Sequence, residues 1–145
     1  MEETVTATMV DFRDSVMTPH QVSSTYSPLA LAYIGDSVFD LLIKNHFVFR
    51  SNMQPEKYHR RVTQIVSANF QSKFIDVYKD RLTDEELAVY KRARNSSPHT
   101  KAKNASLTDY LKATGFEAVI GYLYMSGQDE RIKEIIDAVF VAYDA

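Results

Sequence analysis

Positions 29–40 read LALAYIGDSVFD. This stretch indicates a helix in which one acid lies among apolar residues. Ser27 and Pro28 precede it, and these residue types favour the cap and the first position of an α-helix. Apolar residues then recur at helical spacing, at Leu31, Ile34, Val38 and Leu42. Asp36 lies among them, and a carboxylate in so apolar a stretch carries a desolvation cost unless a cation or hydrogen bonds meet it. The stretch predicts a packed helix and marks Asp36 as a candidate functional residue.

A second stretch of the same kind lies at positions 114–124, which read TGFEAVIGYLY and contain Glu117. Gly35 and Gly121 each interrupt a helical stretch at a cost of ~1 kcal/mol relative to Ala. Such glycines are tolerated where another backbone must come close. One hypothesis is that Asp36 and Glu117 meet across two packed helices and hold Mg²⁺, which prefers oxygen ligands. The alternative is that each carboxylate is a helix-surface residue beside the core.

The remaining pattern is helical, and no window shows the sustained alternation typical of a strand, so the predicted fold class is all-α. A helix is expected to begin at Pro55 and to break or continue near Ser67. Thr83 and Glu86 form a capping-box pattern that predicts the start of a further helix. A polar loop over 95–105 separates it from two more helices, about 107–125 and a last one around 132–140.

Residues 1–26 are polar and weakly periodic, which predicts a mobile or loosely docked N-terminal segment before a domain at 27–145. The chain of 145 residues suits one domain, and its 45% apolar content is enough for a core. The absence of Cys excludes disulfide scaffolds, thiolate zinc sites and thiol nucleophiles, and it favours a cytoplasmic location. The longest apolar run, 29–34, is far shorter than the ~20 residues that span a bilayer, so no membrane partner is expected.

The formal net charge of −2 conceals an uneven distribution of charge. Positions 57–103 hold 11 Lys and Arg against 5 Asp and Glu, a net charge of +6, and the remainder carries −8. Basic and neutral donor side chains that suit phosphate contacts fall into two groups: His59, Arg60 and Arg61, and then Lys91, Arg92, Arg94, Asn95, Lys101 and Lys103. Each group alone could equally be a solvated face. Together with the acid pair they favour a phosphodiester substrate, and duplex RNA fits because it is recognised largely by shape and backbone.

The stretch at 29–40 resembles the signature helix of the ribonuclease III family, and most closely its short form, Mini-ribonuclease III, which lacks a separate double-stranded-RNA-binding domain. The similarity runs from about 29 to 140 and includes IVSA at 65–68, KRARN at 91–95 and TGFEAVIGYLY at 114–124. The order of LAYIGD and FEAVIGYLY along the chain makes the resemblance specific. It implies an all-α endonuclease domain at 27–145, folded as a helical bundle, that itself binds the RNA.

The resemblance also implies a Mg²⁺-dependent homodimer that cleaves duplex RNA and acts in maturation of the 23S ribosomal RNA precursor. Asp36 matches the family's signature aspartate and Glu117 its essential glutamate, so both would be catalytic and metal-binding. The fuller family pattern has acids where this chain has Ala32 and Thr114, and the short form looks similar in lacking both. Thr114, and Asp40 one turn after Asp36, remain candidates for outer positions around the metal, although Asp40 also suits a solvated face.

The face of the signature helix that carries Leu29, Tyr33 and Phe39 is the expected dimer surface, because these residues lie off its core stripe. Two other functions remain open. One is a non-catalytic RNA-binding or ribosome-assembly factor on the same fold, against which the retention of both carboxylates counts. The other is an all-α metal-dependent nucleotide phosphohydrolase, whose sites usually need more clustered acids than this chain has.

Overall fold

The computed structural model describes residues 12–96 and 105–145, with no side chains described for 105 and 106. Within these ranges the chain is helical and contains no strand, which confirms the all-α class. The elements in order are α1 (Pro19–Thr25), α2 (Pro28–Arg50), α3 (Pro55–Val66), α4 (Ala68–Tyr78), the 3-10 helix η2 (Lys79–Arg81), α5 (Asp84–Arg94), α6 (Ala105–Met125) and α7 (Asp129–Asp144).

Side-chain caps begin several of these helices, and those at Ser27 and Thr83 lie where the sequence predicts them. The Ser27 hydroxyl accepts from the Ala30 amide at 3.1 Å at the start of α2. The Ser67 hydroxyl caps α4 and so separates it from α3. At the start of α5, the Glu86 amide donates to the Thr83 hydroxyl at 3.1 Å and the Thr83 amide donates to the Glu86 carboxylate at 3.0 Å. These contacts satisfy amides that have no partner inside the helix.

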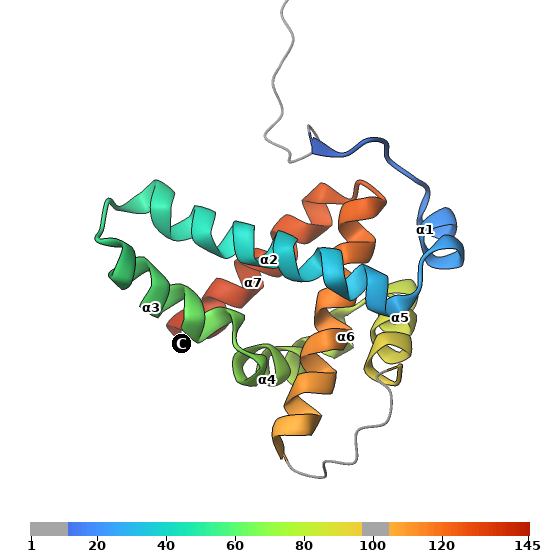
Figure 1. The fold of residues 1–145 in the computed structure, drawn as a ribbon. Coiled ribbons are helices and arrows are strands. Elements are labelled where there is room, and N and C mark those ends of the chain that lie inside the picture. The colour runs from blue at the N-terminus through green and yellow to red at the C-terminus, as the bar shows by residue number, and fades with distance from the viewer. Residues whose placement is uncertain (1–11, 97–104) are drawn as a thin grey trace, which may run out of the picture.

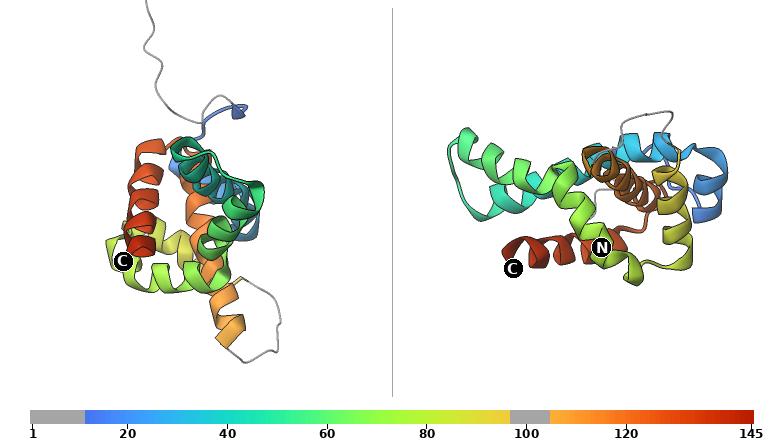
Figure 2. Two further views of the ribbon diagram at one scale, coloured as in Figure 1. Left: turned by 90° about the vertical axis from the view of Figure 1, so that its left-hand side faces the viewer. Right: turned by 90° about the horizontal axis from the view of Figure 1, so that it is seen from below.

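Helix α6 is the centre of the molecule, with α2, α4 and α5 packed around it (Figure 1). Its residues Ala118, Val119, Ile120 and Leu123 have no exposed surface. The hairpin of α2 and α3 extends away from α6 on one side, as the two further views also show (Figure 2). The arrangement places the middle of α2, the start of α4 and the middle of α6 next to one another.

Helices α2 and α6 touch through their backbones at Gly35 and Gly121. A Cβ atom on Gly35 would lie 1.8 Å from the carbonyl oxygen of Glu117, and one on Gly121 would lie 2.0 Å from the carbonyl oxygen of Leu31. Real Cβ atoms do not come this close to other heavy atoms, so both positions require glycine in this packing. The close backbone approach that the two glycines predict is therefore present.

The described part of the N-terminal segment contacts the rest of the chain at a few residues, and its mobile or loose docking stays a prediction. Arg13 donates to the Tyr124 carbonyl and forms an ion pair with Asp129 at 2.8 Å, and its side chain is only 2% exposed. Val22 on α1 is fully buried in the core. Arg13 thus joins this segment to the end of α6 and the start of α7, and residues 1–11 lie outside the described residues.

No single helix among the described residues is long and apolar enough to cross a membrane. Helices α1 and α2 meet the length and composition test only as a pair, and they are bent by 119° relative to one another.

Replacing Gly35 with Ala should destabilise the protein, although Ala normally stabilises a helix interior by ~1 kcal/mol relative to Gly. The added methyl group meets backbone, which cannot rotate away, so a loss of about 2 kcal/mol or more in the free energy of unfolding is expected. Urea denaturation measures it, with Ser37→Ala on the exposed side of α2 as the control. A Gly35→Ala protein as stable as the original would contradict the close packing.

Candidate active site

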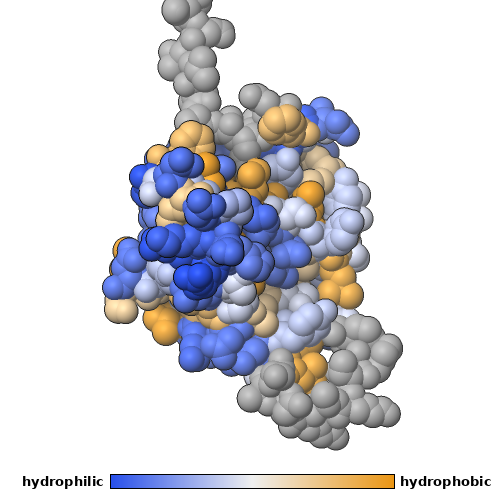
Figure 3. All heavy atoms as spheres, turned by 60° about the vertical axis from the view of Figure 1, so that its left-hand side comes forward, coloured by the Kyte–Doolittle hydropathy of each residue, from blue (hydrophilic) through white to orange (hydrophobic). Residues whose placement is uncertain are grey.

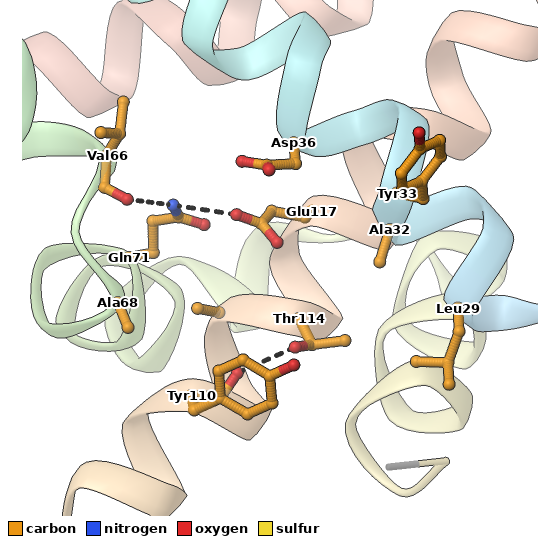
Figure 4. Close-up of a pocket in the computed structure, with 11 residues that line it drawn as sticks. Leu29, Ala32, Tyr33, Asp36, Val66, Ala68, Gln71, Tyr110, Thr114 and Glu117 are labelled. Atoms are coloured by element: carbon orange, nitrogen blue, oxygen red, sulfur yellow. Dashed lines mark hydrogen bonds between the residues drawn. The ribbon is translucent and has the colours of Figure 1, made fainter.

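An open pocket of about 440 Å³ lies between α2, the junction of α3 and α4, and α6 (Figure 4). It is lined by Leu29, Ala32, Tyr33 and Asp36 from α2, by Val66, Ala68 and Gln71 from the junction and α4, and by Tyr110, Ala113, Thr114 and Glu117 from α6. The two acids that the sequence singles out thus share one pocket. No Lys or Arg is among these lining residues.

The carboxylates of Asp36 and Glu117 come together because of the helix contact described above. Asp36 follows Gly35, and Gly35 lies against the carbonyl of Glu117. Asp36 is exposed at the pocket, whereas Glu117 is partly buried. Burial, and then the negative charge of Asp36, raise the pKa of Glu117 to about 8, and a hydrogen bond from Gln71 opposes this shift. When both carboxyls are ionised, no Lys or Arg in the pocket lining offsets their negative charge.

Gln71 is a third polar residue of the site, and the sequence reasoning did not identify it. Its Nε2 donates to Glu117 Oε2 at 3.2 Å and to the Val66 carbonyl at 2.8 Å (Figure 4). The Val66 carbonyl is available because α3 ends at that residue. One signal was present in the sequence: Gln71 lies one turn before the buried Phe74 and Ile75, on the core face of α4.

Of the two residues expected to lie around the metal without binding it directly, Thr114 lies in the pocket and Asp40 does not. Thr114 lines the pocket beside Glu117, but its hydroxyl donates to the Tyr110 carbonyl at 3.0 Å within α6. Asp40 pairs with Lys44 at 2.9 Å along α2 and is not among the lining residues. Ala32, at the other position where the fuller family pattern has an acid, lines the pocket without a polar group.

The described part of the chain contains no group of three or more His, Asp or Glu side chains that could hold a metal ion. Two carboxylates suffice for Mg²⁺, which commonly keeps several waters and binds through one or two carboxylates together with substrate phosphates. Asp36 and Glu117 are the residues that could hold such an ion, and the open side of the pocket leaves room for a phosphate.

The predicted RNA-binding residues form separate groups around this site. His59, Arg60 and Arg61 are exposed on α3, a face that is largely hydrophilic in Figure 3. Lys91, Arg92 and Asn95 are exposed at the end of α5, and Arg94 is partly buried over the ring of Tyr90. Helices α3 and α5 lie on opposite sides of α6 (Figure 1, Figure 2), so the two groups do not form one patch. Lys101 and Lys103 lie outside the described residues.

Comparison with known proteins matches residues 29–128 to the ribonuclease III domain family. The chain is 44% identical to Mini-ribonuclease 3 of Clostridium tetani over 119 residues, which is 81% of this chain and 79% of that protein. It is 40% identical to Mini-ribonuclease 3 of Brevibacillus brevis, covering 79% and 85% of the two chains.

A solved structure of a Fusobacterium nucleatum protein superimposes with a TM-score of 0.72 at 32% identity and covers 79% of this chain and 87% of that one. The family match includes the whole pocket, because every lining residue falls within positions 29–128. The chain belongs to the ribonuclease III family of endoribonucleases, in its Mini-ribonuclease III branch.

Proposed function

We propose that this endoribonuclease cleaves double-stranded RNA in a Mg²⁺-dependent reaction, with the ion held by Asp36 and Glu117. The carrying observation is that two carboxylates share a pocket whose lining contains no Lys or Arg. Burial, and then repulsion from Asp36, raise the pKa of Glu117, and a bound cation would offset the cost of ionising both carboxylates. A divalent cation at this position fits the donor set of carboxylate oxygens.

The pocket residues would have separate roles in phosphodiester hydrolysis. A divalent ion, when bound, supplies a water of lowered pKa and stabilises charge on the phosphate. Asp36 and Glu117 fix its position, and Gln71 restricts the orientation of Glu117 through the hydrogen bond at 3.2 Å.

The basic groups on α3 and α5 would hold the RNA backbone on either side of the pocket. Contacts from Lys and Arg to phosphates are independent of sequence, which suits recognition of a duplex by shape. His59, Arg60 and Arg61 would serve on one side, and Lys91, Arg92, Arg94 and Asn95 on the other, with Lys101 and Lys103 following along the chain.

The expected homodimer would place one such site on each strand of the duplex. Leu29 and Tyr33 on α2 are 39% and 82% exposed and remain candidates for the contact between copies. Phe39 is not a candidate, because it is 1% exposed and packs edge-on against Phe116 in the core. A role in 23S ribosomal RNA precursor maturation and a cytoplasmic location are part of the same proposal.

Asp36→Asn and Glu117→Gln should each lower the cleavage rate of duplex RNA by about 1,000-fold or more, because metal-ion catalysis supplies several kcal/mol. Duplex binding should persist in both variants. Gel analysis of cleavage and filter binding in EDTA measure the two properties, with Asp137→Asn on the exposed side of α7 as the control. Full activity in either pocket variant would exclude the assignment, and binding without cleavage by the unaltered protein would favour the non-catalytic alternative.

The metal-free protein should lose stability as pH rises from about 4.5 to about 8, the range between the ordinary pKa of Glu117 and its raised value. Over this range the folded carboxyl retains a proton that the unfolded chain has released. At about 1.4 kcal/mol per pH unit, unfolding becomes easier by about 4 to 5 kcal/mol. Urea denaturation in EDTA at several pH values measures the change. Glu117→Gln should flatten it, and parallel curves for the two proteins would show that burial does not protonate Glu117.

Replacing Arg92 and Arg94 together with Gln should weaken duplex binding and reduce its dependence on salt. Each lost phosphate contact is expected to lower the slope of log affinity against log salt by about 1. Binding titrations between low and moderate salt measure the slope, with Lys133→Gln on the exposed side of α7 as the matched charge control. An unchanged slope would place the RNA surface elsewhere.

A further inference from the structure

Gln71 carries a buried acceptor that nothing among the described residues satisfies. Its side chain is 1% exposed, and Oε1 has no hydrogen-bond partner, whereas Nε2 has two. Buried polar atoms without partners are rare in folded proteins and require an explanation. The orientation of the amide is determined by its neighbours: the Val66 carbonyl and the Glu117 carboxylate both accept, so the NH₂ group must face them.

The position of this atom connects it to the acid pair. Gln71 lines the same pocket as Asp36 and Glu117, and in Figure 4 its Oε1 lies on the side of Glu117. Asp36, Gln71 and Glu117 are the only lining residues with an amide or carboxyl side-chain oxygen. Thr114 offers its hydroxyl proton to the Tyr110 carbonyl, and Ala32 has no polar group. Gln71 Oε1 is therefore an amide acceptor without a hydrogen-bond partner next to the two carboxylates.

We propose that Gln71 is a positioning residue for the divalent ion. Its N–H group holds the Glu117 carboxylate in the orientation that ligates, and its Oε1 accepts a hydrogen bond from a water in the ion's hydration shell. Mg²⁺ keeps several of its waters when two carboxylates bind it, and such waters are strong donors. The inference rests on the proposed function, since it assumes that Asp36 and Glu117 hold the ion.

Chain connectivity explains how one side chain can hold this position rigidly. Nε2 is tied at 2.8 Å to the last residue of α3 while the backbone of Gln71 belongs to the first turns of α4. Ser67 alone separates the two helices, and its hydroxyl caps α4. Gln71 is thus held from two elements and reaches a third, α6, through Glu117. Partners that orient metal ligands in this way typically affect metal affinity by 10–100-fold.

The test measures Mn²⁺ binding to the RNA-free protein by the electron paramagnetic resonance signal of the free ion. Gln71→Met keeps the size and the apolar contacts but removes both polar atoms, and it should raise the Mn²⁺ dissociation constant by about 10-fold or more. Gln71→Asn, which withdraws the same amide by one methylene group, should show the same loss and serves if the methionine variant does not fold. Duplex binding in EDTA should be unchanged for both.

Controls separate positioning from general destabilisation and from failure of the metal assignment. Ile75→Val removes a buried methyl group from the same helix away from the pocket, so it should leave Mn²⁺ affinity unchanged. If Asp36→Asn and Glu117→Gln lose Mn²⁺ binding while a folded Gln71 variant retains it, the role of Gln71 is overturned and the metal pair stands. If the two acid variants also bind Mn²⁺ normally, the proposed function fails and the inference with it.

Discussion

The backbone contact between α2 and α6 is the constraint on which the rest of the site depends. Gly35 lies against the carbonyl of Glu117, so the residue that precedes one acid touches the main chain of the other. The spacing of the two carboxylates is therefore determined by main-chain atoms, which are stiffer than side-chain packing. Core substitutions elsewhere can change the stability of the bundle without changing the relative position of Asp36 and Glu117.

The same constraint makes the site costly when it contains no cation. A partly buried carboxyl next to a second carboxylate is held with its pKa raised to about 8, and the pocket lining offers it one amide and no positive charge. A structural acid in this fold is treated differently: Glu86 is 2% exposed but caps α5 and pairs with Arg131 at 2.9 Å. Glu86 thus has a cationic partner, whereas Glu117 has only the Gln71 amide, and a buried acid with a raised pKa in a pocket is a candidate functional residue.

Local signals made much of the fold predictable, and long-range contacts explain what was missed. Ser27 and Thr83 act within a few residues of themselves, so their caps can be predicted from the sequence. The paired glycines imply a close approach, which is why Asp36 and Glu117 could be placed together. The partner of Gln71 lies 46 residues away, and Arg13 reaches Asp129 across 116 residues. Phe39 was misplaced because the core surrounds α2 more widely than its apolar stripe indicates.

The contact of Arg13 with the end of α6 has a practical consequence for how the chain is handled. Arg13 binds the Tyr124 carbonyl and Asp129, and the Met17 amide donates to the Met125 carbonyl, so the α6–α7 connection is closed by the N-terminal segment. An expression tag or truncation that disturbs residues 13–17 would expose these carbonyls, about two helical turns from Glu117. If such a protein lost activity, the cause would be fraying at the C-terminal end of α6, and the pocket residues themselves would be unchanged.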